Sequence, residues 1–129
     1  MIIGMGTDIV RIKRIGLTVK RYGDKFLNRI FTPAERAAAE KLAPQKQTAY
    51  YAKRYAAKEA ASKALGSGIG HLAMWQEIEI LNNAAGAPVL TLTGQTADTL
   101  HKLAGGAAVR TFISLSDDES AIATVIFEI

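Results

Sequence analysis

The spacing of apolar residues changes along this chain between a period of two and a period near four, and this change predicts its elements. Alternation over residues 77–81, a polar turn at 82–86 and a second run at 89–92 predict a β-hairpin. Further strands are expected at residues 2–8, 109–117 and 121–126. Helices are expected at residues 10–20, 24–29, 33–42, 45–65 and 96–103. This order predicts an α+β fold, with helices packed on an antiparallel sheet, in one domain over residues 1–129.

The long alanine-rich helix expected in the middle of the chain carries one carboxylate among basic residues. At 100° per residue, Tyr55, Glu59, Ser62 and Gly66 share one stripe, and Lys63 lies one turn beyond Glu59. Alanines cover the remaining surface, so the helix is able to lie close against a neighbour. Considered alone, the pattern favours a solvated helix with a Glu59–Lys63 pair, worth ~0.2–0.5 kcal/mol, and a glycine cap. The alternative is an edge that handles phosphate.

A second polar element supports the phosphate interpretation. Gly4, Gly6 and Asp8 follow the apolar start of the first strand, so Asp8 lies at an expected element boundary. Its default role there is the N-cap of the helix that begins near Ile9. Asp8 and Glu59 together are also able to supply two oxygen ligands to Mg²⁺, whose other positions are filled by water and phosphate oxygens. This second role requires both acids to meet in space.

Residues 6–10 and 54–70 together resemble the holo-acyl-carrier-protein synthases, the short class of 4'-phosphopantetheinyl transferases. The similarity extends along nearly the whole chain and includes residues 31–35, 82–88 and the last two strands. It implies transfer of the 4'-phosphopantetheine group from coenzyme A to a serine of apo-acyl carrier protein in fatty acid biosynthesis, with release of 3',5'-ADP. Because longer transferases of this superfamily contain two such halves, the resemblance also implies a homotrimer whose clefts lie between adjacent subunits.

The resemblance also assigns residues to the expected site. Mg²⁺, held by Asp8 and Glu59, is expected to bind the diphosphate and neutralise charge as the phosphoanhydride breaks. Glu59 and Lys63 are the expected catalytic residues, with Lys63 supporting the leaving phosphate. The residues expected to line the coenzyme A pocket are Arg54, Lys58, Ser62, Lys63, Gly66, Ser67 and Gly68. The glycine loop follows the negative end of a helix, so phosphate binding there must come from outward-facing loop N–H groups, Lys63 and the metal.

Two departures from the family pattern affect the expected chemistry. Family members often carry a histidine in or just after the strand at residues 109–117, and this chain has none there. The turn usually written Gly-Lys-Pro reads Gly-Ala-Pro at residues 86–88, which removes a basic side chain. The candidate bases are therefore Glu59, a metal-bound water and a substrate phosphate, and we hypothesise a water polarised between metal and carboxylate. His71 and His101 have no partner acid or nucleophile at a recognisable spacing and are expected at the surface.

Positive charge is concentrated in the first third of the chain. The formal net charge is +4, and the basic residues of this region, opposed only by Asp24, are Arg11, Lys13, Arg14, Lys20, Arg21, Lys25 and Arg29. In the helix expected at residues 10–20, Ile12, Ile15 and Val19 form the buried stripe, which leaves a basic face in solvent. By resemblance, Arg14 and Arg21 are expected to contact the acidic acyl carrier protein.

Two functions of other classes are weighed against the transferase. The basic region would suit a small nucleic-acid-binding protein, but Tyr22, Phe26 and Phe31 look like helix core and no known binding motif is present. An inactive relative that only binds coenzyme A or carrier protein is suggested by the missing histidine. We expect coenzyme A and acyl carrier protein as partners, and no nucleic acid.

Composition places the chain among compact enzyme domains. It has 129 residues, 49% hydrophobic and 22% charged, which is enough to bury a core. With no cysteine, it forms no disulfide and no cysteine-zinc site. No apolar run approaches the ~20 residues that cross a bilayer, and the first residues enter a strand without a signal-peptide pattern. We expect a cytoplasmic protein that does not bind a membrane.

Overall fold

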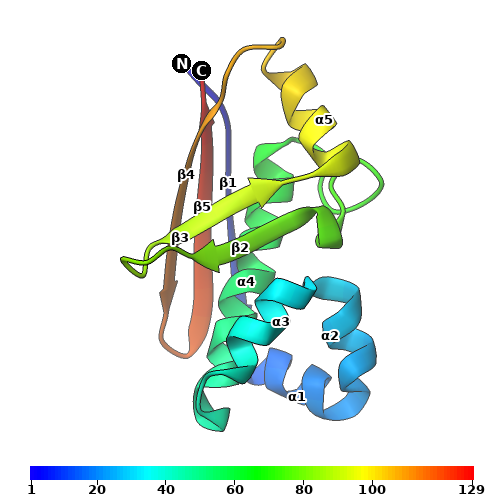
Figure 1. Cartoon of the computed structure of the whole chain (residues 1–129), viewed down its shortest axis with the longest axis vertical. Helices are drawn as coiled ribbons and strands as arrows, with labels where there is room; N and C mark the ends of the chain where they lie inside the picture. Colours follow the sequence, from blue (N-terminus) through cyan, green and yellow to red (C-terminus); the bar gives the residue numbers. More distant parts are fainter.

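The computed structural model describes residues 1–129 and confirms the α+β architecture (Figure 1). Its elements are β1 (Ile2–Arg11), α1 (Ile12–Tyr22), α2 (Asp24–Ile30), α3 (Pro33–Glu40), α4 (Pro44–Ala64), the 3₁₀ turn η1 (Trp75–Glu77), β2 (Ile78–Asn82), β3 (Pro88–Leu92), α5 (Gly94–Leu103), β4 (Arg110–Asp117) and β5 (Ser120–Glu128). Strands β1, β5 and β4 form one antiparallel sheet in that order, and β2 and β3 form a separate antiparallel hairpin.

Helix α4 forms the centre of the molecule and packs against one face of the three-stranded sheet (Figure 1). Its small residues Ala56, Ala57, Ala60 and Ala61 have no exposed surface, as the alanine pattern predicts. On the facing strand β5, every second residue from Ala121 to Phe127 is buried. The core therefore lies mainly between α4 and the sheet, and the opposite face of the sheet has no helix over it.

The remaining elements surround α4 at different heights. Helices α1, α2 and α3 gather at one end, the β2–β3 hairpin crosses the middle, and α5 lies toward the other end (Figure 1). Thr32 begins α3 with a capping box: its hydroxyl accepts from the Glu35 backbone N–H, and the Glu35 carboxylate accepts from the Thr32 N–H at 2.8 Å. None of the helices combines the length and the hydropathy needed to cross a membrane.

One element boundary differs in a way that changes the role of a site residue. We expected β1 to end at Asp8 and a helix to follow, but the strand continues to Arg11 because β5 pairs with it as far as Arg11↔Ser120. Asp8 lies within the strand, opposite Ala123, and the N-cap of α1 is Arg11. The N-cap role considered for Asp8 is therefore wrong, and its carboxylate is available for other contacts.

Two glycines allow β1 to lie directly against the backbone of α4. A Cβ atom added to Gly4 would stand 2.0 Å from the Ala64 carbonyl oxygen, and one added to Gly6 would stand 2.0 Å from the Ala60 carbonyl oxygen. No side chain fits in either place, since real Cβ contacts are never this short. The close approach brings the middle of β1 beside the last two turns of α4, where Glu59 and Lys63 lie.

Candidate active site

Asp8, Glu59 and Lys63 form one cluster where β1 meets α4. The Lys63 Nζ atom donates to the Asp8 Oδ1 atom at 3.0 Å and to the Thr7 carbonyl oxygen at 3.0 Å. Glu59 is half-buried one turn earlier on α4 and interacts electrostatically with Asp8. The two acids expected to meet in space lie close enough for their charges to interact, and Lys63 forms an ion pair with Asp8.

The carboxylate of Glu59 is held in an environment that disfavours its charge. Burial raises the pKa of Glu59, the nearby charge of Asp8 raises it further, and Lys63 and Arg14 offset part of this effect. Two acids that repel each other at a partly exposed site are typical of functional positions.

The residues present fit a hard divalent cation. Asp8 and Glu59 offer carboxylate oxygens, and no group of three or more His, Cys, Asp or Glu side chains able to hold a metal ion occurs in the structure. A pair of carboxylates without a full protein cage suits Mg²⁺, which keeps waters and binds substrate phosphate oxygens. It does not suit a structural zinc site, which requires four protein ligands.

Lys58, expected in the coenzyme A pocket, is instead buried in the core. Its side chain has no exposed surface, its Nζ atom lies 2.7 Å from Glu35 Oε1, and it donates to the Trp75 carbonyl oxygen at 2.9 Å. Burial lowers the pKa of Lys58, and the charge of Glu35 opposes that effect. The ammonium group is thus bound to partners within the core, and the assignment of Lys58 to ligand binding is not supported by its position.

Ser62 and the glycine loop also differ from the expectation. Ser62 has no exposed surface, and its hydroxyl donates to the Glu59 carbonyl oxygen at 2.7 Å. The backbone N–H groups of Ser67 and Gly68 donate to the Ser62 carbonyl oxygen, and that of Gly66 donates to the Lys63 carbonyl oxygen. These N–H groups therefore cap α4 rather than face outward. Gly66 and Ser67 are exposed, and Gly68 is partly exposed.

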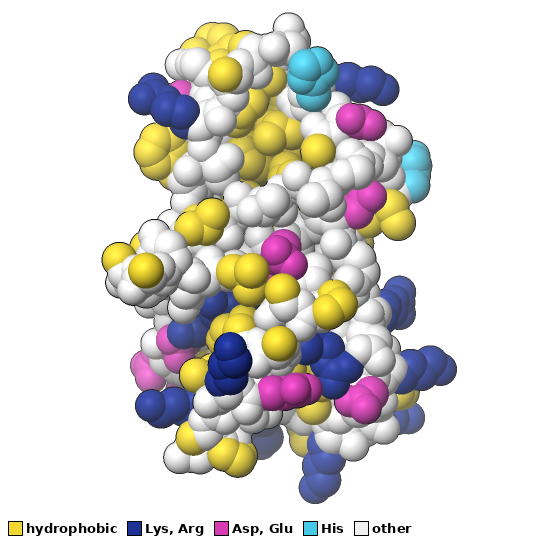
Figure 2. Space-filling view, in the orientation of Figure 1, with side chains coloured by type: hydrophobic (Ala, Val, Ile, Leu, Met, Phe, Trp, Pro, Cys, Tyr) yellow, Lys and Arg dark blue, Asp and Glu magenta, His cyan; other side chains and the backbone are white.

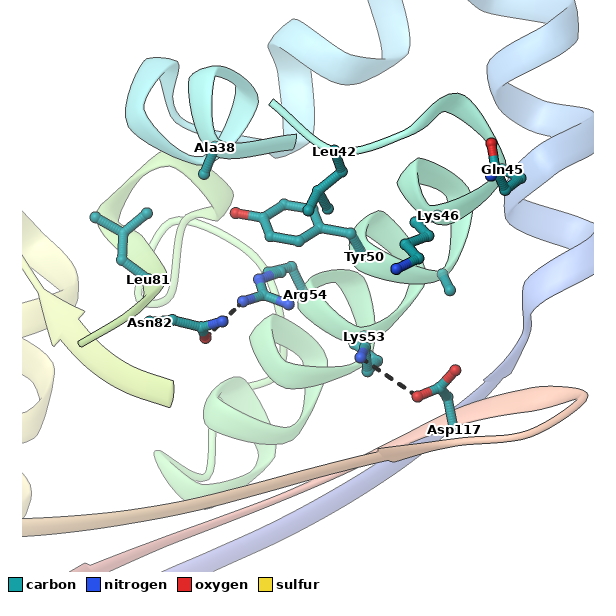
Figure 3. A pocket seen from close by; sticks show the side chains of 11 residues that line it. Ala38, Leu42, Gln45, Lys46, Tyr50, Lys53, Arg54, Leu81, Asn82 and Asp117 are labelled. Atoms are coloured by element: carbon teal, nitrogen blue, oxygen red, sulfur yellow. Dashed lines mark hydrogen bonds and ion pairs between the residues drawn. The ribbon is translucent and has the colours of Figure 1, made fainter. Parts of the chain in front are cut away.

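Arg54 lies on a different side of α4 from the acids. It is 3% exposed, its guanidinium lies 3.8 Å above the ring of Tyr50, and its Nη2 atom donates to Asn82 Oδ1 at 2.9 Å. It lines a pocket between α3, α4, β2 and β4 that is shown in Figure 3. Arg54 is therefore placed to meet a ligand in that pocket, away from Asp8.

The two arginines chosen for the carrier protein lie on the exposed side of α1. Arg14 and Arg21 are both exposed, while Ile15 is buried, as the helical pattern predicts. Arg14 also lowers the pKa of Glu59, so the basic face of α1 reaches the acid cluster. Figure 2 shows that Lys and Arg side chains gather on the half of the molecule that holds α1, α2 and α3.

Sequence reasoning missed two residues of the Arg54 pocket. Lys53 Nζ lies 3.3 Å from Asp117 Oδ1, and both side chains line the pocket. The signal was present, because Asp117 ends the strand in which a family histidine was sought. His71 and His101 are exposed, as expected.

Comparisons with known proteins identify the family of this chain. The model of the 4'-phosphopantetheinyl transferase superfamily matches residues 4–125, so the chain belongs to that superfamily. A curated relative from a Bradyrhizobium species, named holo-[acyl-carrier-protein] synthase, is 48% identical over 121 residues, which cover 92% of this chain and 87% of the relative. The resemblance to these synthases is confirmed.

Solved structures give the same result. The holo-[acyl-carrier-protein] synthase from Neisseria meningitidis aligns with a TM-score of 0.88 at 37% identity and covers 99% of both chains. The synthase from Bacillus anthracis, solved in complex with CoA (3',5'-ADP), aligns with a TM-score of 0.81 at 34% identity and covers 98% of this chain and 96% of its own.

Proposed function

We propose that the protein transfers the 4'-phosphopantetheine group of coenzyme A to a serine hydroxyl of apo-acyl carrier protein, as a step of fatty acid biosynthesis. The observation that carries the proposal is the Asp8–Lys63–Glu59 cluster, which a glycine-mediated contact of β1 with α4 assembles in a member of this superfamily. Relatives of 43–48% identity carry the corresponding name, and structures of such synthases hold coenzyme A.

In the reaction, the serine oxygen forms a bond to the phosphorus that bears the pantetheine arm. The phosphoanhydride bond from this phosphorus to the nucleotide breaks, and 3',5'-ADP leaves with the bonding electrons. We assign the serine proton to a carboxylate oxygen of Glu59, directly or through one water, because Glu59 is the acid of the cluster whose oxygens accept no hydrogen bond from Lys63. The ammonium of Lys63 stabilises the negative charge on the leaving phosphate.

Asp8 and Glu59 would hold Mg²⁺, which when bound neutralises the charge of the diphosphate. In the structure, one Asp8 oxygen accepts from Lys63. Lys63 is half-exposed, so its flexible stem is free to move from Asp8 toward a phosphate group. The dependence on Mg²⁺ is tested by chelation, which should abolish transfer, followed by restoration with Mg²⁺.

The carrier protein is expected to bind along α1. Arg14 and Arg21 present charge that complements an acidic partner, and Arg14 lies close enough to Glu59 to affect its pKa. A carrier bound along this helix would bring its serine toward the acid cluster.

We further propose a homotrimer with sites at the subunit interfaces. The sheet face turned away from α4 is uncovered, and Met5, Ile9, Phe112 and Ile122 are 43–66% exposed on it. In the register of the sheet, Ile126 lies between Met5 and Phe112, and Ile9 lies opposite Ile122; these two apolar rows are separated by Thr7, Thr124 and Ser114. Such a surface is typical of an interface. Light scattering should give the mass of three subunits, and Phe112→Glu should give a smaller particle.

The transfer reaction is tested by mass spectrometry. Incubation with coenzyme A, Mg²⁺ and apo-acyl carrier protein should add one phosphopantetheine group to the carrier, and a carrier whose serine is replaced by alanine should gain nothing. Asp8→Asn should reduce the rate without unfolding the protein. No mass gain over a range of pH and metal concentration would leave only the binding functions, and salt-sensitive nucleic-acid binding without transfer would favour the nucleic-acid-binding protein.

A further inference from the structure

The pocket that contains Arg54 is distinct from the acid cluster and has an unusual charge distribution. It encloses about 620 Å³, and its charged residues are Lys46, Lys53, Arg54 and Asp117. Arg54 and Glu59 point in directions roughly 140° apart around α4, given 100° per residue. Figure 3 shows Tyr50, Arg54 and Asn82 on one side of the pocket and the Lys53–Asp117 pair on another. Three cations thus face one acid.

The guanidinium of Arg54 is buried without a carboxylate partner. It forms no ion pair at contact distance: its guanidinium bonds Asn82 and stacks on Tyr50, and the charge of Glu35 acts on it only from beyond contact distance. Its Nε atom and the hydroxyl of Tyr50 are both buried and have no hydrogen-bond partner. Burial lowers the pKa of Arg54, which is the effect of a charge removed from water. A buried cation with unused donors beside it is a site for an anion, because an unpaired buried charge is costly.

Asp117 is the only acid that lines this pocket, and it is engaged with Lys53 at 3.3 Å. About a third of each side chain is exposed, 28% for Lys53 and 35% for Asp117, so the pair lies at the opening. Asp117 acts on an entering anion in two ways. It repels the anion directly, and it holds the ammonium of Lys53 that would otherwise bind the anion.

We propose that Asp117 sets the affinity of this pocket for a phosphate monoester of the coenzyme, keeping it weak enough for the nucleotide product to leave. The inference rests on the proposed function, which supplies a ligand with such a group. 3',5'-ADP carries one phosphate on each of the 3' and 5' hydroxyls of adenosine. Its 3' phosphate is the group that fits the Arg54 side of the pocket. Asp117 is thus a specificity-determining residue that no proton transfer requires.

The experiment measures dissociation constants of 3',5'-ADP and of 5'-AMP, which lacks the 3' phosphate, by calorimetry. Asp117→Asn should tighten binding of 3',5'-ADP about fivefold, as expected for removal of one nearby like charge, and should change binding of 5'-AMP less than twofold. Asp118→Asn is the matched control, because it makes the same charge change one residue away without lining the pocket. It should change neither constant.

The role of Lys53 is tested in the same assay. Lys53→Met should weaken binding of 3',5'-ADP, and combining it with Asp117→Asn should remove most of the gain seen for Asp117→Asn alone. If Asp117→Asn does not fold, Asp117→Ser should give the same tightening. Melting temperatures recorded for every variant identify a merely structural role, in which Asp117→Asn lowers stability and leaves both constants unchanged.

The outcomes separate this inference from the proposed function. Equal tightening of both nucleotides, an equal effect of Asp118→Asn, or no change in the constant for 3',5'-ADP would each overturn the role of Asp117 while transfer to the carrier continued. Absence of transfer by the wild-type protein would overturn the proposed function itself.

Discussion

Lys58 and Glu59 are neighbours in the sequence, yet they lie on two sides of α4 that differ in how far their charges are buried and compensated. On one side, the Lys58–Glu35 pair has no exposed surface and is completed by the Trp75 carbonyl oxygen. On the other, Glu59 is half-buried beside Asp8 and its charge is only partly compensated by Lys63. The charges on the first side, the sealed side, are compensated within the core. The second side, the open side, keeps charge that is available to a ligand.

The difference shows how a single helix serves both stability and chemistry. Successive residues on a helix are 100° apart, which is enough to move a side chain from the α3 and β2 side into the contact with β1. Removing one partner of a sealed pair leaves a charge in the core, whereas removing a charge from the open side relieves repulsion. Changes on the sealed side should therefore affect folding, and changes on the open side should affect the reaction.

The largest expected effect is on catalysis, from the open side. Glu59→Gln keeps the shape of the side chain and removes its ability to accept a proton, so the transfer rate should fall about 10²- to 10⁴-fold. The measurement is carrier modification under saturating Mg²⁺ and coenzyme A, with Glu119→Gln in the exposed β4–β5 turn as the control. Full turnover by Glu59→Gln would show that the proton goes elsewhere.

The next largest effect is on stability, from the sealed side. Lys58→Met leaves the Glu35 carboxylate buried without its cation and should cost about 3–5 kcal/mol of unfolding free energy. Glu35 would keep its bonds from the Thr32 and Ile80 N–H groups, so a folded variant is expected. Denaturant unfolding measures the loss, and adding Glu35→Leu should recover part of it. An unchanged midpoint for Lys58→Met would mean that the pair is not a stabilising contact.

A smaller effect is expected at the glycine contact between β1 and α4. Gly6→Ala places a methyl group against the Ala60 carbonyl oxygen and should cost about 1–3 kcal/mol, with a loss of transfer activity as β1 moves away. Gly70→Ala is the matched control, since nothing lies within 4 Å of the added Cβ and its backbone has no positive φ. That variant should remain within about 0.5 kcal/mol of the wild type.

The smallest effect is a pH-dependent change in stability without metal. A carboxyl group whose pKa is raised by folding stabilises the protein below its unfolded-state pKa, and that contribution is lost as pH rises through the folded value. Ionised Glu59 is therefore destabilising at neutral pH. In calorimetry with a chelator, Glu59→Gln should melt above the wild type at pH 7, and the difference should vanish as pH falls below the ordinary Glu pKa of about 4.3. A variant that melts below the wild type at pH 7 would contradict the raised pKa.

The sequence was sufficient to predict the parts of the structure that depend on local pattern. The hairpin of β2 and β3, the limits of α2 and the cap of α3 at Thr32 were expected within one or two residues, because turn chemistry and apolar spacing specify them. The convergence of Asp8 and Glu59 was also expected, from the resemblance of residues 6–10 and 54–70 to the holo-acyl-carrier-protein synthases. The end of β1 was not, because pairing with the distant strand β5 extends it past Asp8.

The remaining errors also depend on distant partners. Lys58 was expected in the coenzyme A pocket, but Glu35, from another helix, lies 2.7 Å from its ammonium group and holds it in the core. The glycine loop looked open because its hydrogen bonds to the last carbonyls of α4 are not visible in the residue types. The Lys53–Asp117 pair joins segments that no periodicity connects. Spacing shows which residues share a face, but not what the rest of the fold places opposite that face.

At Gly4 and Gly6, main-chain atoms rather than side chains determine how far β1 stands from α4. The distance between Asp8 and Glu59 therefore does not depend on how the side chains of the apolar interior pack. Protein engineers should be able to redesign that interior for heat resistance while the reacting groups keep their spacing, provided that these two glycines are left untouched.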